Sequence, residues 1–244
     1  MDLSTLKKES ERLKQALQLE GSLIGVSYKD EPDGDEEDKG SPCGAFLAAH
    51  QGKTVTLSKK NCICPGGISH LGFSDKPLSK KTLQMLVEGE KMWCSLAAAN
   101  RLFLDIEGRK APPPTEIGDY VNLVPLEELN YLPDLIISIC DSTQASRFVI
   151  LSGYQDGKVP SVEVAGSMCW SAITYPIVSG NFNVTMGDYT ARRMWNWAPG
   201  KLLVSVPLAR YKMILESLDE CVAGFADPSP EFEKLTERIK TQDK

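Results

Sequence analysis

The stretch Cys62-Ile63-Cys64-Pro65-Gly66-Gly67 constrains the fold more than any other part of this 244-residue chain. A proline followed by two glycines interrupts regular structure, so the two thiols are expected on a short loop. An ordinary hydrophobic core does not need this composition. A buried thiolate cluster, a redox pair of cysteines or a close contact with a ligand does. The stretch therefore predicts where the chemistry lies, but not which reaction takes place there.

The bulk composition is that of a soluble globular protein and argues against several classes of partner. Hydrophobic residues make up 42% of the chain and charged residues 25%, and the formal net charge is −6. Nucleic acids and anionic membranes favour basic surfaces, so neither is an expected partner. No apolar run is long enough to span a bilayer, and residues 1–20 are typical of a charged helix rather than of a signal peptide. We therefore expect a cytoplasmic protein.

The cysteines divide into two groups. There are seven, and an odd number in a chain with cytosolic features favours free thiols or metal ligands over disulfides. Cys140 and Cys221 lie in apolar stretches and Cys94 adjoins a tryptophan on an expected helix, so these three are predicted to fill core space. The candidates for chemistry are Cys43, Cys62, Cys64 and Cys169.

Apolar periodicity predicts an α+β fold in which helices pack on short mixed strands. The expected domain organisation is an N-terminal amphipathic helix within residues 1–20, one α+β domain over 21–225 and a charged tail over 226–244. The N-terminal helix would pack on the core or on a second copy of the chain, so a homo-oligomer is one expectation. The principal expected helices are 3–19, 78–102 and 208–223, and the expected strands are 24–28, 54–57, 135–140, 162–164, 181–186 and 202–206.

Two segments resemble each other and suggest a duplicated half-domain. Each has a cysteine, a helix of small residues, a glycine and an x-Val-Thr-apolar strand, and each is followed by a loop that contains glycine. The first runs from Cys43 to Leu57, and the second from Cys169 to Met186. Pro112-Pro113-Pro114 is a stiff link that would divide the domain into halves 21–111 and 115–225. Duplication would place both cysteines about a pseudo-twofold axis. Chance similarity between short segments is the alternative.

An ordered set of motifs resembles the family called domain of unknown function 169. The set comprises Cys43-x-x-Phe-x-x-Ala-x-x-Gly, Cys64-Pro-Gly-Gly with Leu71-Gly72, Pro133-Asp134 before a strand, Cys169 followed by Gly187-Asp188-x-x-x-Arg192, and Leu203-Val204-Ser205-Val206-Pro207. The resemblance spans roughly residues 20–220. It implies an uncharacterised protein of a family found largely in anaerobic bacteria and archaea. It marks Cys43, Cys64, Cys169, Gly187, Asp188 and Arg192 as positions of interest.

Three thiols from distant parts of the chain suggest one shared site. Soft thiolates favour zinc, copper(I) or an iron–sulfur cluster, and a cysteine followed by proline is frequent at cluster ligands. We therefore predict Cys43, Cys64 and Cys169 as ligands of a metal or an iron–sulfur cluster, with Cys62 as a candidate fourth ligand. Thiol chemistry with Cys64 as the nucleophile is an alternative, and so is a purely structural role for all the cysteines.

Other residues near these cysteines are candidates for binding a ligand. Asp188 could cap a helix with Arg192 as its ion-pair partner, or Arg192 could clamp an anionic small molecule through its guanidinium. Gly66, Gly67 and Gly187 could allow close approach of a ligand. His50 and His70 could reach the thiols as ligands or proton carriers, although a partly exposed position at a helix end is the simpler expectation.

Three functions remain open at the level of sequence. The first is a metalloprotein of anaerobic metabolism that binds an anionic small molecule. The second is a binding module without catalytic activity for a small ligand or cofactor, with structural cysteines. The third is a thiol-dependent enzyme. The sequence does not establish whether the protein is an enzyme at all.

Overall fold

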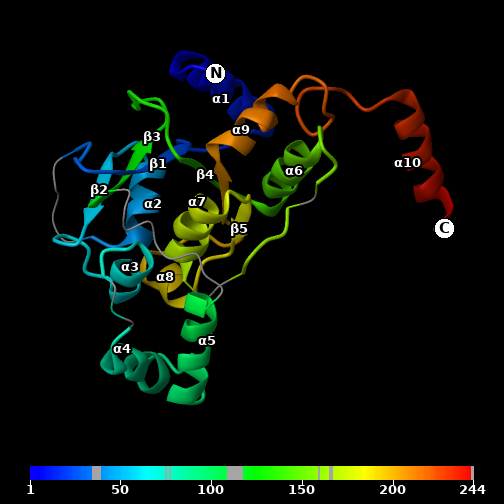
Figure 1. Ribbon diagram of the computed structural model, residues 1–244. Helices are drawn as coiled ribbons and strands as arrows, with labels where there is room; N and C mark the ends of the chain where they lie inside the picture. Colours follow the sequence, from blue (N-terminus) through cyan, green and yellow to red (C-terminus); the bar gives the residue numbers. More distant parts are fainter. Residues whose placement is uncertain are drawn as a thin grey trace.

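The centre of the protein is a six-stranded antiparallel sheet, seen in a computed structural model that describes residues 1–34, 40–74, 76, 78–108, 118–158, 160–164 and 167–242 (Figure 1). Its strands are β1 (Ile24–Lys29), β2 (Val55–Ser58), β3 (Tyr120–Pro125), β4 (Leu135–Cys140), β5 (Asn183–Thr185) and β6 (Leu202–Pro207). The predicted α+β class is confirmed. The pairing is not mixed as expected, because every pair of neighbouring strands described in this sheet is antiparallel.

Helices cover both faces of this sheet. Their bounds are α1 (Leu3–Leu17), α2 (Pro42–His50), α3 (Pro65–His70), α4 (Lys80–Gln84), η1 (Met85–Gly89), α5 (Leu96–Gly108), α6 (Ser142–Gly153), η2 (Trp170–Thr174), α7 (Tyr175–Ser179), α8 (Tyr189–Met194), α9 (Leu208–Glu216) and α10 (Pro230–Gln242). One face carries α2, α3, η2, α7 and α8, and the other carries α1, α6 and α9. Strand β4 is buried along its whole length, as its continuous apolar sequence predicts for a central strand.

The N-terminal helix α1 packs within the chain. Leu6, Leu13 and Leu17 are completely or almost completely buried in the same core cluster as α9. Burial of these leucines accounts for the amphipathic pattern without a second subunit, so self-association stays a prediction. Among the described residues, no helix is both long and apolar enough to cross a membrane.

The sheet has the same topology when it is read from either edge. Its order is β2-β3-β1-β4-β6-β5, and exchanging β1, β2 and β3 with β4, β5 and β6 reproduces this order. The central strands β1 and β4 are antiparallel, so the exchange corresponds to a twofold axis perpendicular to the sheet. This topology supports the predicted duplication of a half-domain. The proposed link at Pro112–Pro114 lies outside the described residues.

Two long helices predicted from the sequence are shorter than expected. Residues 78–102 form α4, η1 and α5, with a break after Gly89 at which Lys91 takes a left-handed backbone conformation (φ 53°). The hydroxyl of Ser95 then accepts a hydrogen bond from the N–H of Ala98 at the start of α5. Likewise, α9 ends at Glu216, where the predicted helix continued to residue 223. In Figure 1, α4 and α5 project from the body as a helical arm.

Residues 162–164 do not form the predicted strand. The backbone N–H and C=O of Glu163 instead exchange hydrogen bonds with the side chain of Asn183 on β5. These bonds hold the backbone of Glu163 beside the edge strand β5, but they do not add a strand to the sheet.

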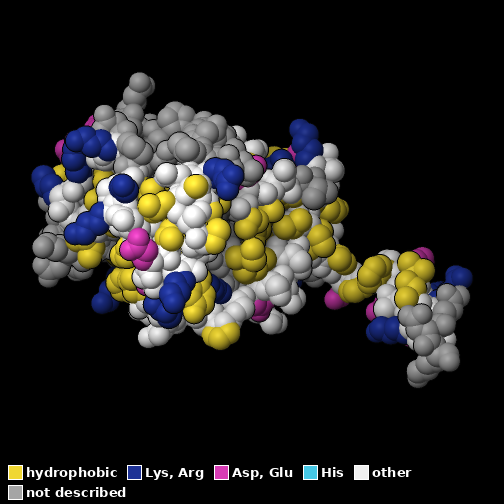
Figure 2. All heavy atoms as spheres, turned by 90° about the horizontal axis from the view of Figure 1, so that it is seen from below, with side chains coloured by type: hydrophobic (Ala, Val, Ile, Leu, Met, Phe, Trp, Pro, Cys, Tyr) yellow, Lys and Arg dark blue, Asp and Glu magenta, His cyan; other side chains and the backbone are white. Residues whose placement is uncertain are grey.

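The C-terminal helix α10 stands away from the body (Figures 1 and 2). Its apolar side chains Phe232, Leu235 and Ile239 are exposed. The tail is therefore charged and helical, as expected. Its helix is amphipathic and does not belong to either of the two main core clusters.

Candidate functional site

Cys43 lies in the first turn of α2. Pro42 occupies the start of this helix, and the hydroxyl of Ser41 accepts a hydrogen bond from the N–H of Gly44 at 3.4 Å. These residues suit a helix start, where a proline loses no hydrogen bond and a serine satisfies a free N–H. Trp195, which follows α8, lies against Gly44: a Cβ there would be 2.7 Å from the indole ring. Cys43, the neighbour of Gly44, is half-buried.

Cys64 is the N-cap of α3. Its sulfur accepts a hydrogen bond from the N–H of Gly67 at 3.4 Å, and Pro65 takes the first helical position. The predicted loop is therefore limited to residues before Pro65, because proline and glycine are tolerated at a helix start. A Cβ on Gly67 would be 2.8 Å from Cγ of Pro42 and 3.0 Å from Sγ of Cys62. Gly67 is thus required for the close packing of α3 against the start of α2, whereas a Cβ on Gly66 would meet nothing closer than 3.8 Å.

Cys169 is buried at the start of η2, on the same face of the sheet. Met168, which precedes it, packs against Gly187, where a Cβ would overlap the methionine methyl group. Gly187 also has a φ of +79°, which glycine adopts without strain. This contact brings the loop before α8 up to the start of η2.

Asp188 is the N-cap of α8. Its Oδ1 accepts a hydrogen bond from the N–H of Ala191 at 2.7 Å, as predicted for a helix cap. Burial raises the pKa of the carboxyl group, opposed by its hydrogen bonds from backbone N–H groups. The expected ion pair with Arg192 is replaced by another contact: the guanidinium donates to the carbonyl of Lys201 at 2.9 and 2.7 Å. Binding of an anionic ligand by Arg192 stays a prediction.

These five residues, Cys43, Cys62, Cys64, Cys169 and Asp188, form what we call the thiol site. Burial raises the pKa of the Cys43 and Cys169 thiols, and charge interactions within the site raise it further. Burial likewise raises the pKa of Cys62 to about 11. The strongest charge interaction of Cys43 is with Asp188, and that of Cys169 is with Cys64. The predicted cysteines therefore lie close together, and the described cysteines are all free thiols.

The thiol site is not preorganised around an ion. Within the described ranges, no three His, Cys, Asp or Glu side chains are already placed to share one metal. The caps at Cys64 and Asp188 turn these two side chains toward their own helices. Binding of a metal by these residues would therefore require their side chains to move.

Tyr28 is a site residue that the sequence analysis missed. Its hydroxyl is buried beside Thr174 and Cys169, and no hydrogen bond of ordinary geometry satisfies it in the described part of the chain. Burial raises the pKa of this phenol. The signal in the sequence was weak, because a tyrosine at the end of an apolar strand is usually explained by packing.

The two histidines differ in their relation to the site. His70, at the end of α3, is buried; its Nε2 lies 3.0 Å from the hydroxyl of Ser167, and burial lowers its pKa to about 4. His50 lies at the far end of α2 from Cys43, where its Nδ1 is 3.3 Å from the carbonyl of Ser22. His70 is therefore not the exposed residue expected, and His50 is separated from the thiols by the length of its helix.

The remaining cysteines lie elsewhere. Cys140 and Cys221 belong to the core on the opposite face of the sheet, as predicted. Cys94 is exposed in the arm, so its prediction as a core residue is wrong. The cause is the break after Gly89, which removes Cys94 from any helix.

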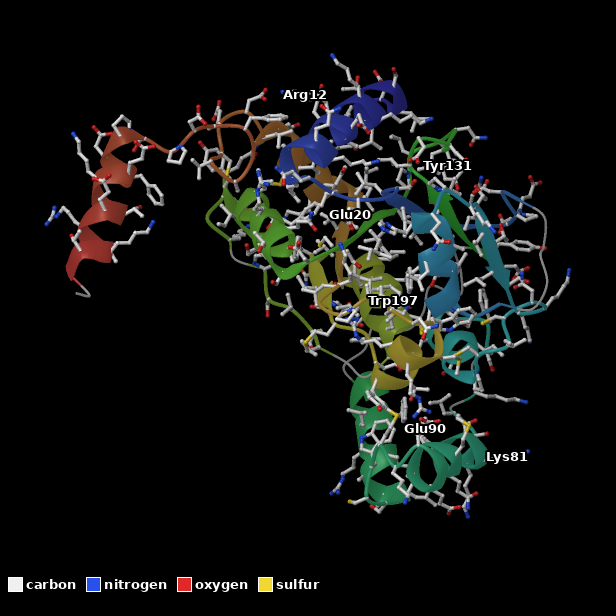
Figure 3. The ribbon with its side chains drawn as sticks, turned by 180° about the vertical axis from the view of Figure 1, so that it is seen from behind. Arg12, Glu20, Lys81, Glu90, Tyr131 and Trp197 are labelled. Atoms are coloured by element: carbon white, nitrogen blue, oxygen red, sulfur yellow. The ribbon has the colours of Figure 1, made fainter. Side chains whose placement is uncertain are left out.

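The helical arm rests on elements that carry the site. Its core includes Trp170, the neighbour of Cys169, and Phe103 of the arm stacks on His70. Arg193 of α8 pairs with Glu90 at 3.1 Å. Figure 3 places Glu90 at the arm and Trp197 within the body. A surface hollow of about 350 Å³ lies instead beside α1, lined by residues including Lys7 and Lys14, on the opposite face of the sheet.

Comparison with known proteins gives a family without an assigned activity in its description. Residues 12–217 match the family model DUF169, described as "Uncharacterised ArCR, COG2043". A relative from Methanocaldococcus jannaschii, described as "Uncharacterized protein MJ0308", is 24% identical over 233 residues, which cover 90% of this chain and 96% of the relative. No solved structure matches the chain.

Proposed function

We propose that this chain, which belongs to the DUF169 family, binds a thiophilic metal ion or an iron–sulfur cluster at the thiol site. The observation that carries the proposal is the convergence of free thiols from three separate segments. Cys43 comes from α2, Cys62 and Cys64 from the segment before α3, and Cys169 from η2. Thiolates are the ligands that zinc, copper(I) and iron–sulfur clusters prefer.

The surroundings of the sulfurs support this function. The N–H of Gly67 already donates to the Cys64 sulfur, and hydrogen bonds of this kind stabilise metal-bound thiolates. The packing of α3 on α2 through Gly67, and of Met168 on Gly187, fixes the backbone positions of the donors. Metal binding would release the thiol protons to solvent and draw the side chains inward. The positive charge of the metal would then neutralise the negative charge of the thiolates, which would otherwise be costly to bury.

The anionic small molecule predicted from Arg192 is a second part of this proposal. Arg192 and Asp188 lie on the same short helix, so a ligand held by the guanidinium would sit at the edge of the thiol site. The bond from Arg192 to the carbonyl of Lys201 would have to be shared or exchanged for this to occur. We therefore expect any such ligand to bind after the metal and to depend on it.

The test is purification of the full chain without oxygen, followed by metal analysis and a visible spectrum. We expect bound zinc, or iron with sulfide and a broad visible absorption. Replacing Cys43, Cys64 or Cys169 by serine should remove the metal. The matched control is Cys94→Ser, because this exposed thiol lies outside the site. Metal content that does not change in any of the three site variants would overturn the proposal.

A further inference from the structure

The helical arm, made of α4, η1 and α5, has a hydrophobic core of its own. Its buried side chains Leu83, Ala99 and Phe103 belong to a cluster separate from the two cores on the faces of the sheet. Among the described elements, α4, η1 and α5 pack mainly against one another, and the arm projects from the body in Figure 1. Separation of the arm from the body would therefore leave both main cores intact.

Two aromatic contacts join the arm to elements of the thiol site. Phe103 stacks on His70 at the end of α3, with ring centroids 6.2 Å apart, and the same helix begins at its cap, Cys64. Trp170, the first residue of η2 and the neighbour of Cys169, is buried in the core of the arm. The arm thus packs on the elements that carry two of the site cysteines.

Two polar contacts join the arm to α8, the helix that Asp188 caps. The guanidinium of Arg193 pairs with Glu90 at 3.1 Å, and the hydroxyl of Thr190 donates to the sulfur of Met92 at 3.2 Å. Figure 3 shows Glu90 on the side of the arm that faces the body. The side chain of Arg193 is 62% exposed, and an ion pair in such a setting contributes little to stability. The aromatic contacts therefore do most to hold the arm in place.

The arm lies over a junction between these three elements. The hydroxyl of Thr174 in η2 donates a hydrogen bond to the carbonyl of His70, the residue on which Phe103 stacks. The loop before α8 meets the start of η2, because a Cβ on Gly187 would overlap the methyl group of Met168. One body, the arm, therefore touches α3, η2 and α8 close to the place where they meet.

We infer that the arm is a lid on the thiol site, closed on α3, η2 and α8 together, and that a molecule reaches Cys169 when the arm lifts. Lifting the arm separates Phe103 from His70 and exposes Trp170, so the start of η2 loses its outer packing. The sulfur of Cys169 then becomes open to a thiol-reactive molecule or a metal ion. A lid of this kind controls access to the thiols whether or not a metal binds them, so it can be tested in the metal-free chain.

Timed maleimide labelling of the reduced, metal-free full chain, read by mass spectrometry of its peptides, tests the lid. Three cysteines act as separate reporters in one sample. Cys94 is exposed in the arm and reports the reactivity of the reagent. Cys140 is buried in the core on the opposite face of the sheet and reports unfolding of the whole chain. Cys169 reports opening of the site, and in the wild-type protein it should react far more slowly than Cys94.

Phe103→Ala removes the stacking on α3 and should raise the labelling rate of Cys169 by about tenfold or more, with no change at Cys140. Glu90→Arg places two positive charges at the contact with α8 and should raise the Cys169 rate about two- to fivefold. Adding Arg193→Glu reverses the pair and should restore the wild-type rate. The matched control is Met85→Ala on the exposed surface of the arm, which should change none of the three rates.

Two results would overturn the lid. One is a Cys169 rate that stays at the wild-type value in both Phe103→Ala and Glu90→Arg. The other is a Cys169 rate that rises only in step with that of Cys140, since the whole chain then unfolds. If circular dichroism shows that Phe103→Ala is not folded, Glu90→Arg and its rescue by Arg193→Glu decide alone, because neither substitution removes a buried apolar side chain.

Discussion

Cys64 and Asp188 hold the same position in two equivalent helices: each caps its helix by accepting a hydrogen bond from the N–H three residues later. One cap offers sulfur and the other offers oxygen. The first turn of a helix provides backbone donors that stabilise either acceptor. The matching caps therefore occupy equivalent places in the two halves of the sheet, and both lie in the thiol site.

The capping role of Asp188 can be measured without any metal. Asp188→Ala removes the acceptor for the N–H of Ala191 and should lower the free energy of unfolding by about 1 kcal/mol. Asp188→Asn keeps an acceptor and should cost clearly less. Urea denaturation in the presence of a chelator measures both changes. Equal destabilisation by the two substitutions would show that the cap does not stabilise α8.

The two adjacent glycines of α3 should respond in opposite ways to alanine. At Gly67 a Cβ would lie 2.8 Å from Pro42 and 3.0 Å from the Cys62 sulfur, so Gly67→Ala should destabilise the fold by about 1–3 kcal/mol. At Gly66 the nearest atoms are at 3.8 Å. Gly66→Ala should therefore stabilise the fold by about 0.5–1 kcal/mol, because alanine loses less backbone entropy in a helix. Thermal or urea unfolding of the two variants gives the comparison, and similar effects would contradict the packing of α3 on α2.

Burial of His70 should make stability depend on pH. Its pKa falls from 6.5 to about 4 on folding, so the unfolded chain binds the proton more tightly. Stability from this group is therefore complete above pH 6.5, is lost as the pH falls, and stops changing below about 4. Between pH 7 and pH 5 the loss should be about 2 kcal/mol. His70→Gln should remove that part of the slope, and a slope equal to that of the wild type would show that His70 is not buried as neutral imidazole.

Thiol modification should follow exposure. Cys94 is exposed in the arm, whereas Cys140 and Cys169 are buried and burial raises the pKa of both thiols. We expect a maleimide to label Cys94 first in the metal-free protein, and Cys140 and Cys169 only after unfolding. Mass spectrometry of peptides after timed labelling measures the order. Early labelling of Cys169 would show that the thiol site is open to solvent.

The strongly apolar strands were predictable from the sequence, but β3 was not. Strand β3 contains Asn122, a polar residue that is fully buried. Its side-chain oxygen accepts a hydrogen bond from Thr56, and its side-chain amide donates to the carbonyl of Glu31. These partners are distant in sequence, so local patterning gives no reason to expect a polar residue in a central part of the sheet. The run Leu135–Cys140, by contrast, is apolar throughout and forms the strand with the predicted bounds.

The candidate site was also predictable only in part, because local sequence patterns identify some of its residues and not others. The short repeat and the cysteine positions indicated that Cys43, Cys64 and Cys169 lie together, and the fold does bring them together. The equivalence of Asp188 with Cys64 could not be read from the sequence, because different residue types occupy the two positions. Only the order of the strands and the matching helix caps relate them.

The most direct measurement for the central claim is the metal content of the reduced protein, purified without oxygen, beside that of the combined variant Cys43→Ser, Cys64→Ser and Cys169→Ser. Circular dichroism would first establish that both chains are folded. The account predicts a stoichiometric amount of zinc or of iron with sulfide in the wild-type protein, and none in the variant. A folded wild-type protein that holds no metal, or a variant that holds as much as the wild type, would contradict it.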